Sequence, residues 1–165
     1  MTGERWRCFV AVPIGESLRA DLRAAVDAWR KEPALAGMRW TDPEGWHLTL
    51  AFLGPIDAAS IPELVEQLAA VAQAHPTTRS ATGGLGAFPT PAHARVAWYG
   101  VEDADDRLSH LASAVAVALA LDGDGSRPFR PHLTLARARR EAADLRAWLA
   151  SASAPEGISS PIASS

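Results

Sequence analysis

The tetrapeptide His-Leu-Thr-Leu occurs twice in this sequence, at residues 47–50 and 132–135, which begin 85 residues apart (132 − 47). Alternation of polar and apolar residues is typical of a strand with one buried face. In such a strand the histidine and the threonine of each copy share one face, and the leucines share the other. If the two strands face each other, two imidazoles and two hydroxyls meet over a common cleft. The four candidate site residues are His47, Thr49, His132 and Thr134.

Two imidazoles in one cleft suit a reaction that removes a proton at one point and delivers it at another. Imidazole titrates near neutral pH, so one ring can accept a proton while the other donates one. The threonine hydroxyls can donate hydrogen bonds to an anion as charge develops on it. A metal site is the alternative for a histidine pair, but zinc and iron sites generally add a third protein ligand. No carboxylate or cysteine stands at a motif position, so we expect acid–base chemistry without a metal or other cofactor.

Two arginines beside the second copy are further candidates. Arg130 lies two residues before His132, so strand alternation places it on the same face, where its guanidinium can hold a phosphate. Arg137 has the opposite parity and reaches the cleft only if a bulge or a strand end intervenes. Three aromatic residues are placed either to stack a nucleobase or to pack in the core: Phe9, Trp40 and Trp46. The remaining histidines lack a partner motif and are expected on the surface: His75, His93 and His110.

The same two elements precede each copy of the motif. An apolar run at 8–14 predicts a buried strand, and apolar residues at helical spacing predict a helix over 16–31. The order recurs with a strand at 95–101 and a helix at 103–121. The intervals also match, since 38 residues separate Phe9 from His47 and 36 separate Val96 from His132. These flanks predict two similar units related by a pseudo-twofold axis, with the two histidine strands across a central cleft.

Turn and cap signals set the remaining elements. The glycine and proline at 54–55 are expected to end the first motif strand. Residues 60–63 have the pattern of a capping box, with a proline in the first turn of the helix that follows. An edge strand is expected over 77–85, and the two prolines within 86–94 favour a loop there.

The last helix is expected over 141–150. We therefore predict one bilobal domain over residues 1–150 and a loosely ordered tail over 151–165, which is small and polar. The chain has 165 residues, 48% of them hydrophobic and 21% charged, as in an ordinary globular domain.

Charge and cysteine content limit the classes of partner and compartment. A net charge of −3 argues against a large footprint on long nucleic acid, but permits a short RNA end or a nucleotide in a local basic pocket. The single cysteine, Cys8, excludes a disulfide framework and suits a reducing cytosol. Residues 1–7 lack the apolar core of a signal peptide, and no apolar run reaches spanning length. We expect a cytoplasmic monomer that binds RNA ends or small cyclic nucleotides and no membrane.

Five segments carry a family resemblance: FVAV at 9–12, WHLTLAFLG at 46–54, GLGAFP at 84–89, RVAW at 95–98 and FRPHLTLAR at 129–137. These segments resemble those of the two-histidine phosphoesterases. They occur in the same order as in that family and cover the chain from its first strand to about Arg140. Within that family the chain is most similar to the RNA 2′,3′-cyclic phosphodiesterases formerly called 2′-5′ RNA ligases (LigT/ThpR-like). Family members usually continue into further strands, for which residues 154–165 offer no counterpart.

The resemblance implies a fold and an activity. The implied fold is α+β and bilobal, with pseudo-twofold antiparallel sheets lining a central cleft and helices outside. The implied activity is metal-independent hydrolysis of a 2′,3′-cyclic phosphate to a 2′-phosphate, with His47 as general acid and His132 as general base. The residues expected to bind substrate are Thr49, Thr134, Arg130, Arg137 and Phe9.

Two alternatives to hydrolysis remain open from the sequence. The first is 2′-5′ RNA ligation, which is the reverse use of the same site. The second is a non-catalytic module that binds RNA ends or nucleotides. The short tail is the only support for the second, and the intact histidines of both copies speak against it.

Overall fold

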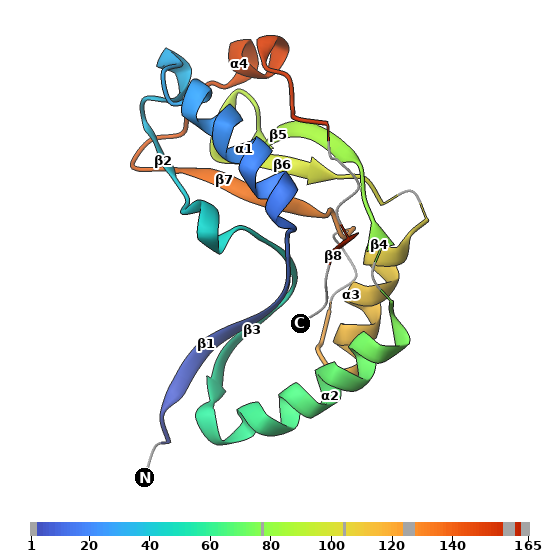
Figure 1. Cartoon of the computed structure of the whole chain (residues 1–165). Coiled ribbons are helices and arrows are strands. Elements are labelled where there is room, and N and C mark those ends of the chain that lie inside the picture. The colour runs from blue at the N-terminus through green and yellow to red at the C-terminus, as the bar shows by residue number, and fades with distance from the viewer. Residues whose placement is uncertain (1–2, 77, 104, 124–127, 157–160, 163–165) are drawn as a thin grey trace.

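The chain forms two lobes, each built on an antiparallel sheet, and a third, two-stranded sheet joins two short strands (Figure 1). The computed structural model describes every residue except 1–2, 77, 104, 124–127, 157–160 and 163–165. The strands are β1 (Arg5–Pro13), β2 (Met38–Trp40), β3 (His47–Asp57), β4 (Thr78–Arg79), β5 (Thr82–Thr90), β6 (His93–Val101), β7 (His132–Ala138) and β8 (Pro161–Ile162). The α-helices are α1 (Glu16–Trp29), α2 (Ile61–Ala74), α3 (Arg107–Ala118) and α4 (Arg146–Ser151), and three 3-10 turns lie at Pro33–Leu35, Pro43–Gly45 and Ala58–Ser60.

The two motif strands belong to different sheets. Strands β1 and β3 form a two-stranded ribbon, and the larger sheet has the order β2-β7-β6-β5. In each sheet the motif histidine pairs with the first strand of its own repeat, His47 opposite Pro13 and His132 opposite Gly100. Strands β3 and β7 also contact each other across the molecule. The predicted bilobal α+β fold with antiparallel sheets is therefore confirmed.

The helices of the two repeats are exchanged between the lobes. Helix α1 follows β1 along the chain but lies, with α4, against the four-stranded sheet (Figure 1). Helix α3 follows β6 but contacts β3 and α2 in the other lobe. Each motif strand is thus supported by a helix from the other repeat, which ties the two units together.

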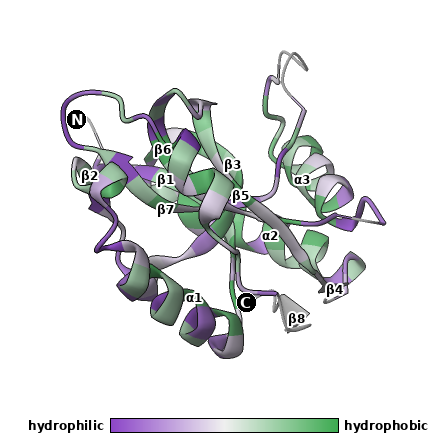
Figure 2. Cartoon of the chain, turned by 90° about the horizontal axis from the view of Figure 1, so that it is seen from above, coloured by the Kyte–Doolittle hydropathy of each residue, from purple (hydrophilic) through white to green (hydrophobic). Residues whose placement is uncertain are grey.

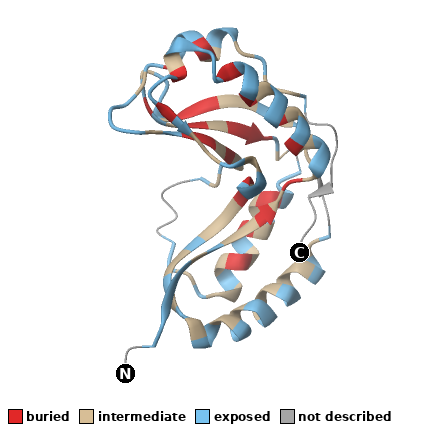
Figure 3. Cartoon of the chain, turned by 60° about the vertical axis from the view of Figure 1, so that its left-hand side comes forward, coloured by how far each residue is buried: buried red, intermediate tan, exposed pale blue. Residues whose placement is uncertain are grey.

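The main core lies in the lobe of the four-stranded sheet. Figure 3 shows buried residues concentrated in this sheet and in the helices above it. The alternating apolar and polar residues of α1, visible in Figure 2, turn Leu22, Val26 and Trp29 inward. The rings of Trp29 and Trp148 meet edge to face, with centroids 5.4 Å apart. In the other lobe α2 has no fully buried residue, so burial gives the four-stranded lobe more of the hydrophobic stabilisation.

Two predicted boundaries in the first half are wrong. Strand β3 continues through Gly54 and Pro55 to Asp57, because Gly54 adopts a φ of +69° and a bulge opposite Cys8 and Phe9 absorbs the extra residue. The predicted capping box at 60–63 does not form. Ser60 makes no side-chain cap hydrogen bond, since it already has helical dihedral angles as the last residue of the preceding 3-10 turn.

The segment predicted as a loop over 86–94 is mostly strand. Strand β5 extends to Thr90, and its one proline, Pro89, is tolerated because β5 is the edge of its sheet. The last helix begins at Arg146 and not at residue 141. Before the helix, Ala143 forms an isolated bridge to Ala94 of β6, in which the two residues exchange backbone hydrogen bonds of 2.8 and 2.9 Å.

Helix α3 begins at Arg107, four residues later than predicted, because Asp103 caps it from outside. The carboxylate accepts hydrogen bonds from the backbone N–H groups of Leu108 and Ser109 at 2.8 and 2.9 Å, and from the Ser109 hydroxyl at 2.7 Å. Burial raises the pKa of Asp103, but the hydrogen bonds from the Ser109 hydroxyl and the two N–H groups outweigh it and hold the pKa below its ordinary value of 3.8.

The predicted tail is described at 151–156 and 161–162, and its other residues lie outside the described part of the chain. The Tyr99 hydroxyl donates a hydrogen bond of 3.2 Å to the Pro155 carbonyl, and Ala152 and Ala154 pack against the core. Strand β8 pairs with β4. The one-domain division at residue 150 and the loose order of the tail stay predictions. Among the described residues, no helix combines the length and apolar character needed to cross a bilayer.

Candidate active site

A cavity of about 1010 Å³ is lined by residues of both sheets. All seven residues expected to act in catalysis or to bind substrate line it: Phe9, His47, Thr49, Arg130, His132, Thr134 and Arg137. The alternation within each motif explains this arrangement, because the leucine between histidine and threonine is buried in both copies. The structure thus brings the two motifs to one cavity, while the roles of their side chains stay predictions.

The two imidazoles are held by the same local hydrogen bond. The Nδ1 of His47 lies 2.6 Å from the Gly45 carbonyl oxygen, and the Nδ1 of His132 lies 2.6 Å from the Arg130 carbonyl oxygen. A carbonyl oxygen only accepts, so Nδ1 carries the hydrogen in both rings. This bond fixes the tautomer and leaves Nε2 of each ring available to a ligand.

Aromatic rings support each histidine. Phe9 stacks on His47, with ring centroids 4.8 Å apart and planes at 24°. Phe88 meets His132 edge to face at 5.1 Å, and Trp98 lies 6.1 Å from the same ring. Trp98 can lie there only because residue 86 is glycine, since a Cβ atom at Gly86 would come within 2.1 Å of the indole.

The two predicted arginines reach the cavity by different routes. Arg130 precedes β7, lines the cavity and offers its own carbonyl to His132. For Arg137 the strand contains a bulge, which is one of the two conditions that its parity required. Trp98 pairs with Thr134 but Ala97 pairs with Ala136, so one residue of β7 is passed over. That shift changes the parity of the strand and turns Arg137 to the face of Thr134.

A hydrogen-bonded brace links the two motifs through Thr41, which also lines the cavity. The indole Nε1–H of Trp46, the residue before His47, donates to the Thr41 hydroxyl at 2.8 Å. That hydroxyl in turn donates to the carbonyl oxygens of Thr134 and Leu135 in the second motif, at 2.8 and 2.9 Å. Trp46 is buried and the three bonds are partly buried, so the brace fixes the start of β3 relative to β7.

Arg19 of α1 holds the turn that leads into the first motif. It is only 8% exposed, and its Nη1 donates to the carbonyl oxygens of Pro43 and Glu44, both at 2.9 Å. The next carbonyl along the chain, that of Gly45, accepts the hydrogen bond of His47. Arg19 therefore supports the position of His47 through the backbone.

The other candidates differ in where they lie. Trp40 does not line the cavity but packs against the core beneath the Arg30 guanidinium. Trp46 does line the cavity, but it is largely buried and its indole N–H is bound to Thr41, so it serves the brace. The three histidines outside the motifs are absent from the cavity lining: His75, His93 and His110. Among the described residues, no group of three or more histidine, cysteine or acidic side chains is placed to hold a metal ion.

The lining residues that were missed from the sequence include Thr41, Phe52, Phe88 and Arg95. Phe52 is 78% exposed and pairs across the ribbon with Phe9, a relation that the bulges of β1 and β3 conceal. Phe88 was assigned to a loop. Its position two residues after Gly86 would have placed it on the Trp98 face if β5 had been recognised as a strand. Arg95 begins the RVAW segment of the family resemblance, but nothing in the sequence marked its side chain as a cavity residue.

Comparison with known proteins adds independent findings. The family model described as "LigT like Phosphoesterase" matches residues 12–98. An RNA 2′,3′-cyclic phosphodiesterase of Archaeoglobus fulgidus is 31% identical over 136 residues, which are 82% of this chain and 74% of that protein.

Two crystal structures share the fold. The TT0787 protein of Thermus thermophilus superposes with a TM-score of 0.72 at 28% identity, covering 95% of this chain and 84% of that one. The LigT protein of E. coli complexed with 3′-AMP gives a TM-score of 0.65 at 26% identity, covering 81% and 74%.

Proposed function

The chain belongs to the LigT-like phosphoesterase family, and from that premise we propose that it hydrolyses 2′,3′-cyclic phosphate at RNA or nucleotide ends, leaving a 2′-phosphate. The observation that carries the proposal is the matched pair of imidazoles. Each is held at Nδ1, and both line one cavity together with two threonines and three arginines.

Opening the ring requires a proton to be removed from water and another to be delivered to the departing ribose oxygen. His132 acts as general base, taking the proton of the attacking water at its neutral Nε2. His47 acts as general acid, giving the proton on Nε2 to the 3′ oxygen as its bond to phosphorus breaks. The phosphorus keeps its bond to the 2′ oxygen, so the product is the 2′-phosphate. The reaction needs the two rings in opposite protonation states.

The other lining residues hold the phosphate during this step. The hydroxyls of Thr49 and Thr134 donate hydrogen bonds to the non-bridging oxygens, where negative charge grows in the transition state. The guanidinium of Arg130 binds the same anion, which supplies a charge-assisted hydrogen bond beside His132. Phe9 keeps the His47 ring in place and offers its exposed edge to the nucleoside.

The direct test is incubation with a nucleoside 2′,3′-cyclic phosphate, followed by identification of the product isomer by ³¹P NMR. The proposal predicts the 2′-phosphate. Formation of the 3′-phosphate, or no turnover by a folded protein, would contradict it. A parallel reaction offering a 2′,3′-cyclic end together with a 5′-hydroxyl RNA end measures joining, which is the reverse use of the same cavity.

A further inference from the structure

The cavity carries more positive charge than a single phosphate requires. Three of its lining residues are arginines: Arg95, Arg130 and Arg137. Among the described residues that line it, none is acidic, although the whole chain has a net charge of −3. The cavity is therefore locally basic in a chain that is acidic overall.

Arg95 lies far from the two histidines along the same cavity. The β6–β7 register places Gly100 opposite His132 and Val96 opposite Arg137. Val96 and Gly100 are four residues apart on β6, so Arg137 and His132 lie roughly 13 Å apart along the sheet, at about 3.3 Å per residue. Arg95 is one residue further along.

The guanidinium of Arg95 is directed to that far end. Its Nη1 donates a hydrogen bond of 2.8 Å to the backbone carbonyl of Arg140, which follows the end of β7. This contact uses one N–H group and leaves the others for a ligand. A guanidinium held in this way loses little conformational freedom on binding an anion.

Two further arginines adjoin Arg95 at this end of the sheet. Arg137 stands opposite Val96 on one side and opposite Arg39 of β2 on the other. Within the described part of the chain, none of Arg39, Arg95 and Arg137 lies within 4.0 Å of a carboxylate group, whereas five other arginines do: Arg19, Arg23, Arg30, Arg107 and Arg146. Three adjacent cations without an acidic partner favour an anionic ligand.

We propose that Arg95, with Arg39 and Arg137 beside it, forms a second anion subsite that binds a backbone phosphate of the RNA strand on the 5′ side of the reacting end. The inference rests on the proposed function, because that function places the reacting phosphate between His47 and His132. A nucleoside 2′,3′-cyclic phosphate has one phosphate and leaves this subsite empty. An RNA end has a phosphate at every nucleotide and fills both sites.

The exposed aromatic residues of the cavity suit the same ligand. Single-stranded nucleic acid sites combine a basic groove for the backbone with aromatic rings for the bases. Phe9 and Phe52 are 49% and 78% exposed and lie on the ribbon that faces the arginine-bearing sheet. A strand held by Arg95 would pass these rings on its way to the histidines.

The test compares kcat/KM for three substrates: a nucleoside 2′,3′-cyclic phosphate, the same nucleotide with a 5′-phosphate, and a trinucleotide with a 2′,3′-cyclic end. The trinucleotide should be the best substrate. Arg95→Gln should lower the ratio of its kcat/KM to that of the mononucleotide by roughly tenfold, the usual effect of one charged hydrogen bond. In the same variant, the negative slope of log kcat/KM against log salt for the trinucleotide should become less steep by about 0.7, because one phosphate contact is lost.

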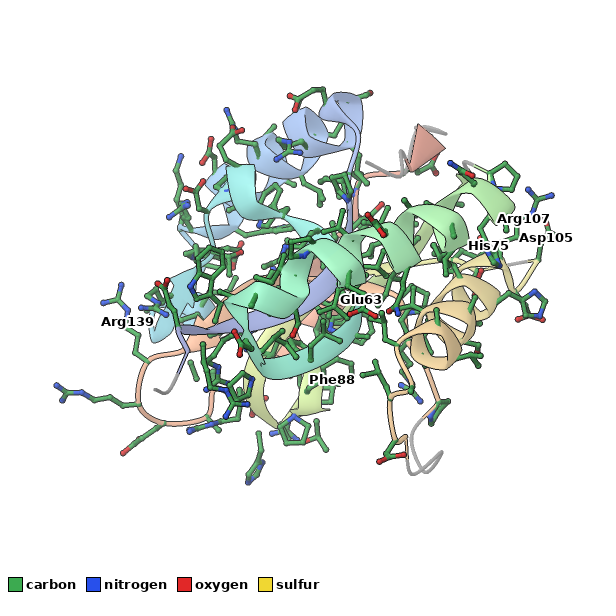
Figure 4. The ribbon with its side chains drawn as sticks, turned by 90° about the horizontal axis from the view of Figure 1, so that it is seen from below. Glu63, His75, Phe88, Asp105, Arg107 and Arg139 are labelled. Atoms are coloured by element: carbon green, nitrogen blue, oxygen red, sulfur yellow. The ribbon has the colours of Figure 1, made fainter. Side chains whose placement is uncertain are left out.

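Arg107→Gln is the matched control, since it removes the same charge from an exposed position at the α3 end of the molecule (Figure 4). It should leave the ratio unchanged. A ratio that Arg95→Gln does not lower, or a trinucleotide that is no better than the mononucleotide, would overturn the subsite. A gain already seen with the 5′-phosphate would support it and identify the adjacent phosphate as the one bound.

Equilibrium binding separates this inference from the proposed function. The dissociation constant of a trinucleotide ending in a 2′-phosphate is measured beside that of a nucleoside 2′-phosphate, with no turnover required. Arg95→Gln should raise the dissociation constant of the trinucleotide by roughly tenfold more than that of the nucleoside 2′-phosphate. If the protein hydrolyses nothing but shows this difference, the subsite stands and the hydrolytic function falls. Equal weakening of both would overturn the subsite alone.

Discussion

His47 and His132 face one cavity in the same way, each with its Nδ1 hydrogen-bonded at 2.6 Å to the backbone carbonyl oxygen two residues upstream. The bond is a local feature of each motif, so the duplicated sequence produces a duplicated geometry. Both Nε2 atoms are left for the ligand, and either ring can in principle give or take a proton. The assignment of His47 as acid and His132 as base comes from the family resemblance and not from this geometry.

Replacement of Arg130 should chiefly weaken binding of the phosphate. Arg130→Ala is expected to raise KM and lower kcat/KM about tenfold or more, because a charge-assisted hydrogen bond to the anion is lost. Arg139→Ala is the control, since Arg139 follows β7 and does not line the cavity (Figure 4). If steady-state kinetics give equal constants for Arg130→Ala and the native protein, Arg130 does not bind the substrate.

The brace between the motifs should matter more for kcat than for KM. Trp46→Phe keeps most of the buried ring but removes the donor to Thr41, at a cost of about 1 kcal/mol in the free energy of unfolding. We expect kcat to fall by roughly tenfold to 100-fold, because small displacements of reacting groups cost this much. Trp148→Phe is the matched control: Trp148 is equally buried, and its Nε1 has no hydrogen-bond partner among the described residues. Equal kcat values for the two variants would show that the brace does not position His47.

Much of the candidate site could be predicted because its residues follow short-range rules. A period of two places His47 with Thr49 and His132 with Thr134, and the structure keeps each pair on one face. Arg137 shows where such rules stop, since it reaches the cavity only through a bulge set by the pairing of β7 with β6. The alternation along the sequence shows that Arg137 needs a bulge to face the cavity, but it cannot show whether the strand contains one.

The errors in the fold have the same origin. Prolines favoured a loop over 86–94, yet an edge strand tolerates proline, and whether a strand is at an edge depends on the whole sheet. The start of α3 was placed too early because Asp103 lies outside the helix and caps its first turn from there. Arg95 was overlooked for a similar reason, as it is passed over in the pairing of β6 with β5 and only the folded structure places it in the cavity lining.

Asp103 makes the stability of the α3 lobe depend on pH. Its pKa is lowered in the folded protein, so its contribution is complete above the ordinary value of 3.8 and is lost as pH falls through the lower folded value. At neutral pH, Asp103→Asn should cost about 1 kcal/mol, as loss of a helix cap does. Urea unfolding should show this difference shrinking below pH 3.8. Asp122→Asn, at an exposed position after α3, is the control, and a difference that stays constant with pH would contradict the prediction.

Activity should not depend on a metal ion. The described residues place no group of three potential ligands together, and the mechanism assigns both proton transfers and phosphate binding to side chains. We expect turnover of a 2′,3′-cyclic nucleotide to survive exhaustive treatment with a chelator. Loss of activity that a divalent metal restores would show that the mechanism is incomplete.

The pairing of His47 and His132 is tested most directly by kcat/KM for the two single variants and the double variant. His47→Ala and His132→Ala should each lose about 10²–10⁴-fold, the usual contribution of a general acid or base. Because both act in one transition state, the double variant should lose far less than the product of the single losses. His93→Ala, outside the cavity, is the control, and the native protein should show a bell-shaped pH profile. A loss below about tenfold in either single variant would contradict the account, since it falls short of the range for a general acid or base.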